Sequence, residues 1–273
     1  MRRFPPIALL VLLVGVVLAG CGSDGPDGSP AEVLAAATKQ TQDAKSSRVA
    51  IDVSTAGAQP VKVTGEGVFD YAGKGTLNLD LPFGENGAPA RVELIIDGDT
   101  VYQKFPPELA ARLPGGKQWL KYSLKDLQES QGGGAAAGTS NDPTQSLTFL
   151  RGISGEVTEV GKEDVRGDEA THYKATIDLQ KAAAAAGPQK PAFDQLISQF
   201  AGTTFPADIW IDDEGRVRKM VYTADIKPSG STAAQKATTS LELFDFGAEV
   251  TINPPPASEV TDASKLLEGT KKS

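Results

Sequence analysis

Residues 205–217, with the sequence FPADIWIDDEGRV, decide the fold class of this chain. The apolar residues Ala207, Ile209 and Ile211 alternate with more polar neighbours, which predicts a half-buried β-strand. An Asp-Asp-Glu-Gly run then supplies the residues of a tight turn, and residues 217–226 alternate again. The stretch therefore predicts an antiparallel β-hairpin.

The same period of two recurs along most of the sequence, and short turn segments separate the alternating runs. Short turns make neighbouring strands antiparallel, and one long sheet of this kind must curl. We therefore predict an α+β fold with a single strongly curved antiparallel sheet. About eleven strands are expected, at residues 48–54, 61–69, 77–81, 92–96, 101–104, 119–122, 157–162, 172–179, 207–212, 217–226 and 234–246.

Helical patterns are fewer. Ser29 precedes Pro30 and Glu32, which is the order of an N-cap, a first-turn proline and an acidic residue near the positive end of a helix. This predicts a helix that extends to about Lys45. Shorter helices are expected at residues 108–113, 143–150, 181–186, 193–200 and 258–267.

The N-terminus has the layout of an export signal: a basic start, an apolar run from Ile7 to Leu18, and then small residues. The small residues end at Cys21, in the order Leu18-Ala19-Gly20-Cys21. This box resembles the bacterial lipobox, in which the cysteine thiol receives a diacylglycerol and becomes the new N-terminus. The alternative is an ordinary secreted protein with a cysteine near its cleavage site.

The sequence predicts three consecutive parts. Residues 1–20 are expected to form the lipoprotein signal peptide, and residues 21–30 a flexible tether with a reach of about 30 Å. Residues 31–273 are expected to form the folded domain. Within it, the Gly/Ala-rich segment 131–140 is expected to be a flexible insertion, or else a boundary between two domains.

Charge and cysteine content limit the partners. The chain has 27 basic and 35 acidic residues, and removal of residues 1–20 takes away two basic ones, which leaves 25 − 35 = −10. A negative surface repels phosphate backbones, so nucleic acid is not expected as a partner. Cys21 is the only cysteine, so no disulfide is expected. The covalent diacylglycerol on Cys21 is the only prosthetic group expected.

Candidate catalytic and metal-binding residues are scarce. His172 is the only histidine, it lies in a predicted strand, and the sequence has no Gly-x-Ser-x-Gly elbow. One histidine and one acylated cysteine do not supply the ligands of a zinc site. The acidic runs at 97–99 and 212–215 lack the spacing of an EF-hand loop and suit hairpin turns. No enzyme activity and no metal are therefore expected, although a pair of carboxylates for glycoside hydrolysis stays open.

The predicted strands instead supply aliphatic faces. These side chains form an ordinary core if helices cover the sheet fully. A curled sheet with too few helices leaves an apolar pocket, in which an acyl chain gains about 0.8 kcal/mol for each buried CH₂. The residues expected to line this pocket are Val61, Val63, Leu77, Leu79, Leu94, Ile96, Ile209, Ile211, Val221 and Leu243.

The segment 205–217 contains the pattern Pro-x-x-hydrophobic-Trp-hydrophobic-Asp-x-x-Gly-x-hydrophobic. With the lipobox, the short first helix and the eleven strands, it resembles actinobacterial lipoproteins of the LppX/LprAFG family and the wider LolA-like carriers. The resemblance implies a half-barrel sheet with helices across its concave face, a cavity for acyl chains, and no catalytic residues. The chain departs from the family at residues 131–140 and 182–186, where the cavity would be closed.

We therefore expect a monomeric lipoprotein, anchored through Cys21 at the extracytoplasmic face of the cell membrane. The resemblance implies that it binds acyl lipid or lipoglycan and carries it within the cell envelope. Because the tether reaches only about 30 Å, an anchored carrier must hand its cargo to a partner, such as an envelope transport protein, or be released in a form that is unmodified at Cys21. The alternative is a non-enzymatic sensor or scaffold lipoprotein that binds a protein partner.

Overall fold

The computed structural model describes residues 28–57, 60–83, 88–111, 116–123, 144–187, 190–227 and 234–263. The expected signal peptide, Cys21 and the insertion at 131–140 lie outside these residues, so they remain predictions from the sequence.

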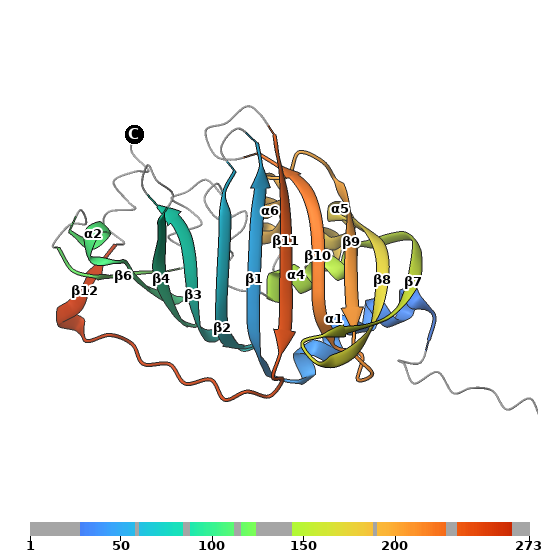
Figure 1. Ribbon diagram of the computed structural model, residues 1–273, viewed down its shortest axis with the longest axis horizontal. Helices are drawn as coiled ribbons and strands as arrows, with labels where there is room; N and C mark the ends of the chain where they lie inside the picture. The colour runs from blue at the N-terminus through green and yellow to red at the C-terminus, as the bar shows by residue number, and fades with distance from the viewer. Residues whose placement is uncertain are drawn as a thin grey trace, which may run out of the picture.

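One sheet of twelve strands runs through the described residues, in the order β12-β6-β5-β4-β3-β2-β1-β11-β10-β9-β8-β7 (Figure 1). Two consecutive meanders, β1 to β6 and β7 to β11, meet where β1 pairs with β11. Strands on both sides of the Gly/Ala-rich segment thus share one sheet. The strands are β1 (Ser46–Ala56), β2 (Lys62–Asp70), β3 (Lys74–Phe83), β4 (Ala88–Asp97), β5 (Thr100–Lys104), β6 (Trp119–Ser123), β7 (Ile153–Val165), β8 (Asp168–Asp178), β9 (Thr204–Ile211), β10 (Val217–Ile226), β11 (Gln235–Phe244) and β12 (Val260–Asp262).

The eleven strands expected from the alternating pattern are all present, and they pair in antiparallel fashion. The sheet is nevertheless mixed, because β12 lies parallel to β6, with Val260 opposite Trp119. The helix expected from residue 258 is wrong in its described part, since a 3₁₀ turn, η3 (Ala257–Glu259), leads directly into β12. The unpaired backbone groups at the edge of β6 bind this segment, and such pairing outweighs a weak local helix propensity.

The helices lie mainly on one side of the sheet. Figure 1 shows α1, α4, α5 and α6 behind the β7–β11 half. We call this side the inner face and the opposite side the outer face. The helices are α1 (Pro30–Asp43), α2 (Pro107–Ala110), α4 (Thr144–Thr148), α5 (Leu179–Ala185) and α6 (Lys190–Ile197), with a 3₁₀ helix, η1 (Phe149–Gly152).

α1 begins where the capping pattern predicts. The Glu32 carboxylate accepts hydrogen bonds from the Ser29 hydroxyl (2.7 Å) and the Ser29 backbone N–H (2.9 Å). These bonds hold the pKa of Glu32 below its usual value. α1 is then tied to the rest of the helix layer by the Thr38 hydroxyl, which donates a hydrogen bond of 3.0 Å to the Leu147 carbonyl.

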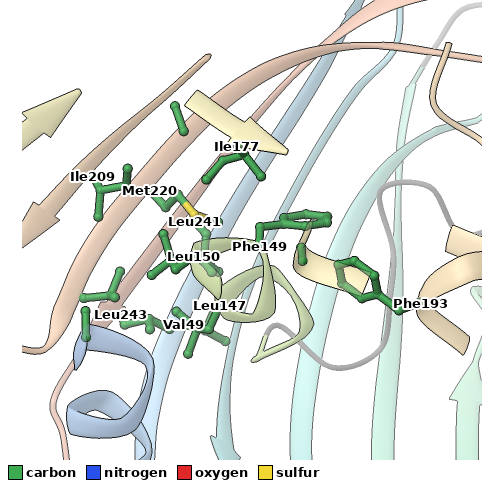
Figure 2. Close-up of a cluster of buried hydrophobic side chains, with 14 of the residues drawn as sticks. Val49, Leu147, Phe149, Leu150, Ile177, Phe193, Ile209, Met220, Leu241 and Leu243 are labelled. Carbon is green, nitrogen blue, oxygen red and sulfur yellow. The ribbon is translucent and has the colours of Figure 1, made fainter. Parts of the chain in front are cut away.

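The core forms where α4 and η1 lie against the centre of the sheet (Figure 2). Leu147 and Leu150 point towards the strands, and Met220 of β10 and Leu241 of β11 point towards them. All four side chains are buried. The centre of the inner face is therefore filled by protein side chains.

An aromatic cluster extends this core towards α6. The ring centroid of Phe149 lies 5.5 Å from that of Phe193 and 5.6 Å from those of Phe205 and Tyr222. The interplanar angles of 64° to 86° are those of edge-to-face pairs, which aromatic rings prefer. The cluster connects η1 and α6 to β9 and β10.

The β7–β8 hairpin folds over the outer face. Its strands are joined by a turn at Arg166 and Gly167, and the Arg166 guanidinium lies 4.1 Å from the ring centroid of Phe244 on β11. Two irregularities in the pairing of β7, at 154–158 and 159–161, bend the strand. The hairpin tip thereby reaches the centre of the sheet (Figure 1).

Under this hairpin lies a second buried group, separate from the main core, which we call the outer-face cluster. It consists of Val165, Ala170 and Trp210, with Val221 packed against them. Trp210 lies on the polar-facing side of its strand, as the alternation predicts, and yet it is only 9% exposed. It is covered by the β7–β8 hairpin, not by a helix.

Candidate functional site: the apolar inner face

The inner face holds most of the residues predicted to line an apolar pocket. Strand pairing places Leu77 opposite Leu94 and Leu243 opposite Val49, so apolar side chains follow one another across the sheet. Seven of the predicted residues lie in the main core, at 0% to 4% exposure: Leu77, Leu79, Leu94, Ile96, Ile209, Ile211 and Leu243.

The other three predicted residues are placed differently. Val63 is partly buried against the same core. Val61 precedes β2 and is 41% exposed. Val221 lies on the outer face, in contact with the outer-face cluster.

A β-bulge explains the position of Val221. Val217 pairs with Ile211 and Lys219 pairs with Trp210, so Arg218 is an extra residue in β10. An extra residue reverses which face the following side chains occupy. Simple alternation from Val217 therefore puts Val221 on the wrong face.

The β2–β6 half of the inner face differs from the β7–β11 half in its cover. The described helices pack mainly on β7, β8 and β10 (Figure 1). Most inner-face side chains of β2 to β6 are nevertheless buried. They include four residues absent from the predicted lining, namely Phe69, Val92, Val101 and Tyr122. Val92 lies two residues before Leu94 in the same strand, so the strand period of two could have predicted that it lies on the inner face. The same prediction for Tyr122 requires the pairing register of β5 and β6.

One polar group lies in the apolar interior. Burial raises the pKa of the Tyr222 hydroxyl, and hydrogen bonds with Thr239 and Ser146 oppose this only in part. Tyr222 thus remains neutral over the physiological range. The phenol adds a hydrogen-bonding group to the aromatic cluster without adding a charge.

The outer face carries a groove of about 600 Å³ that has a different character. Arg91 bonds Asp80 through two hydrogen bonds, of 3.0 and 2.9 Å, and Arg166 bonds Glu242 at 2.6 Å. Asp52 is paired with Lys62 at 3.1 Å. The groove is lined by Ala50, Ile51, Asp52, Thr64, Gly65, Glu66, Asn78, Asp80, Arg91, Arg166, Ser240 and Glu242. Such a lining does not suit an acyl chain, because the chain would remove paired charges from water.

His172 lies on the outer face and contacts two carboxylates. Its Nδ1 is 2.9 Å from Glu163 Oε1, and its Nε2 is 2.7 Å from Asp208 Oδ1. Its ring stacks on Trp210 with a centroid distance of 4.2 Å. Both ring nitrogens thus face carboxylates and neither faces a hydroxyl nucleophile.

Among the described residues, no group of three or more His, Cys, Asp or Glu side chains is arranged to hold a metal ion. None of the helices in the same part of the chain combines the length and the apolar character of a membrane span.

Among solved structures, the chain is similar to that of LprF from Mycobacterium bovis. The match has 19% identity and a TM-score of 0.48, and it covers 85% of this chain and 100% of LprF. No protein-family model matches the sequence.

Two Streptomyces proteins are similar in sequence. A Streptomyces coelicolor protein named as a candidate lipoprotein is 28% identical over 210 residues, which span 75% of this chain and 61% of that protein. A 31.2 kDa protein encoded between rplA and rplJ in Streptomyces griseus is 31% identical over 256 residues, which span 88% of this chain and 81% of that protein. The chain therefore belongs to the family of this Streptomyces griseus protein.

Proposed function

We propose that this protein is a lipoprotein of the cell envelope that holds acyl chains of a lipid or lipoglycan against the inner face of its sheet. The observation that carries the proposal is the apolar row on β2, β3 and β4. By the strand register, the inner-face positions within 63–69, 75–81 and 90–96 carry only apolar residues or glycine. An acyl chain along these positions would meet no charged side chain of β2, β3 or β4.

The membrane anchor is proposed on two grounds. The box Leu18-Ala19-Gly20-Cys21 has the order of a lipobox, and the Streptomyces coelicolor relative is named as a candidate lipoprotein. Acyl chains on Cys21 would hold the domain at the extracytoplasmic surface of the membrane, with a tether of about 30 Å. A carrier held in this way hands its cargo to a partner within the envelope.

We infer that the sheet curls around the inner face as a half-barrel. Glycines at the inner-face positions Gly65, Gly67 and Gly75 support this, because they let neighbouring strands approach closely on that side. A Cβ on Gly67 would lie only 2.0 Å from the Thr76 carbonyl oxygen. The change in strand direction from β1 to β6 in Figure 1 agrees with a strongly twisted sheet.

Energetics favour long chains as cargo. Burial of about 16 CH₂ groups gains about 13 kcal/mol, and association costs about 4–15 kcal/mol. Most inner-face side chains are already buried in the structure, so an acyl chain must also displace their contacts with one another, which adds to the free-energy cost of binding. A lipid with two or more long chains is therefore the favoured cargo.

Native mass spectrometry of the protein purified from its own host tests this function. We expect a bound lipid with long acyl chains in a fixed ratio to protein. Protein that is free of lipid, and that takes up none from vesicles of host lipid, would instead support the sensor or scaffold function.

A further inference from the structure

The surroundings of His172 on the outer face suggest a role in holding the β7–β8 hairpin. The side chain is only 8% exposed, and both ring nitrogens lie within hydrogen-bond distance of a carboxylate. A neutral imidazole has a single N–H, so only the doubly protonated ring can donate to both. The site therefore fits an imidazolium ion.

Glu163 extends this contact from β7 to β9. Its Oε1 faces His172 of β8, and its Oε2 accepts a hydrogen bond of 2.8 Å from the Trp210 indole N–H of β9. The hydrogen bonds from Trp210 and His172 hold the pKa of Glu163 below its usual value, so the group stays ionised. One side chain of the edge strand thus binds two other strands.

Two ion pairs hold the same hairpin without involving His172. Arg166 at the tip bonds Glu242 of β11, and Asp168 pairs with Arg218 of β10. Partial burial of Glu242 favours its neutral form, but the bonds from Arg166 and Lys219 outweigh this and lower its pKa. The outer-face cluster adds apolar contacts. Neither these ion pairs nor the apolar contacts contain an imidazole. Of the hairpin contacts among the described residues, only those of His172 therefore depend on the protonation of an imidazole ring.

We propose that His172 is the pH-responsive part of a latch that holds the β7–β8 hairpin over the outer face. With the ring doubly protonated, Glu163 and Asp208 are both paired. Loss of one ring proton turns a lone pair towards one carboxylate, which weakens the connection from β7 to β9. The cations nearby are Lys174, which lies opposite Asp208 in the register, and Lys219, whose Nζ lies 5.4 Å from the centroid of Trp210.

Opening of the latch would affect two surfaces. Arg166 at the hairpin tip forms part of the wall of the outer groove, so the groove can widen only if the ion pair of Arg166 with Glu242 also opens. β7 also packs against α1, the helix that follows the expected membrane tether. Protonation of His172 would therefore affect how firmly the edge strand β7, which packs against α1, is held to the sheet.

Nuclear magnetic resonance of the full-length protein labelled with ¹⁵N-histidine tests the latch, because every histidine signal comes from His172. We expect two ring N–H signals at low pH and one after the ring has titrated. Over the same pH change, hydrogen-exchange protection factors of β7 and β8 amides should fall about tenfold, as for loss of one charged hydrogen bond, while those of β3 and β4 stay constant. A single ring N–H throughout, or unchanged protection in β7 and β8, would overturn the proposal.

Two variants separate the latch from general effects of pH. His172→Gln keeps one donor but cannot gain a proton, so protection of β7 should no longer depend on pH. Asp80→Asn breaks an exposed ion pair on β3 and should leave the response of β7 as in the wild type. Retention of the wild-type pH response by His172→Gln would rule out His172 as its source. If that variant does not fold, the ring signals of the wild type decide alone.

Discussion

Thr41 shows how one hydroxyl group joins the helix layer to the sheet. It lies fully buried in α1, accepts a hydrogen bond of 2.9 Å from the Val217 N–H, and donates one of 2.8 Å to the Ala37 carbonyl. Val217 begins β10 at the bulge. The Thr41 hydroxyl therefore satisfies a buried N–H at an irregular point of the ladder.

Replacement of Thr41 tests this contact. Thr41→Val leaves the Val217 N–H without a partner and should lower the free energy of unfolding by about 1–3 kcal/mol. Thr41→Ser keeps the hydroxyl group, so its free energy of unfolding should fall by less than that of Thr41→Val. Urea denaturation at neutral pH measures both. Equal stability of Thr41→Val and the wild type would show that the hydrogen bond between Thr41 and Val217 does not stabilise the fold.

The lowered pKa of Glu163 predicts how the stability of the protein changes as pH falls. Its lowered pKa means that its hydrogen bonds with Trp210 and His172 stabilise the fold above the unfolded value of about 4.5 and stop doing so as pH falls through the folded pKa. Glu163→Gln should thus be less stable than the wild type at pH 6, and the two should converge towards pH 3. Urea midpoints across this range provide the measurement. Parallel curves for the two proteins would contradict the assignment.

Sequence reasoning at the residue scale succeeded where alternation was regular. Leu77, Leu79 and Leu94 lie on the face that period two predicts. Val221 does not, because the bulge after Val217 shifts the alternation and nothing in the residue types there marks a bulge. The sequence could not predict the contacts of His172, because Glu163 and Asp208 belong to the neighbouring strands β7 and β9 and are brought to it only by strand pairing.

At the scale of elements, β2 depends on its glycines. Gly65 and Gly67 face the inner side, and leucines of β3 occupy the adjoining space. A Cβ on Gly65 would lie 2.6 Å from Leu79 Cδ2. The β2–β3 pair is thereby closer on its inner side than side chains on both strands would allow.

Gly67→Ala tests this close approach. The new Cβ would meet the backbone carbonyl of Thr76, which a flexible side chain cannot relieve, so a loss of about 1–3 kcal/mol or more is expected. Gly202→Ala is the matched control, since its Cβ would lie 3.8 Å from the Thr204 carbonyl oxygen, which is ordinary van der Waals contact. Guanidinium denaturation compares the three proteins. A neutral Gly67→Ala would mean that β2 and β3 separate at little cost.

Strands were easier to predict than their ends or their partners. The alternation of apolar and polar residues predicted eleven strands, because each of these strands has one apolar face and one more polar face. It gave β7 as 157–162, whereas the strand spans Ile153–Val165, since its irregular pairing breaks the alternation. β12 was missed because it forms only on contact with β6, and its three residues carry no period of their own.

At the scale of the molecule, the two meanders divide the inner face. The β7–β11 half is covered by the described helices, whereas the β2–β6 half buries its apolar side chains away from them. The sequence could predict the apolar faces, but not which half the helices cover, because that depends on the central pairing of β1 with β11.

The anchor is tested by the location of a cysteine variant. Cys21→Ala removes the thiol that would carry the diacylglycerol. We expect the variant to leave the membrane fraction of host cells and appear in the soluble or secreted fraction, as immunoblotting would show. Cys21→Ser, which also lacks a thiol, should behave alike. Membrane retention of both variants would mean that another feature holds the protein there.

Binding of acyl chains to the inner face of β2–β6 can be measured as the ratio of lipid to protein in native mass spectra of host-purified protein. Leu79→Phe fills the inner face and Asn78→Phe adds the same ring to the outer face of the same strand. We predict bound long-chain lipid in the wild type and Asn78→Phe, and less or shorter-chain lipid in Leu79→Phe. Equal lipid in both variants, or none in the wild type, would contradict the account.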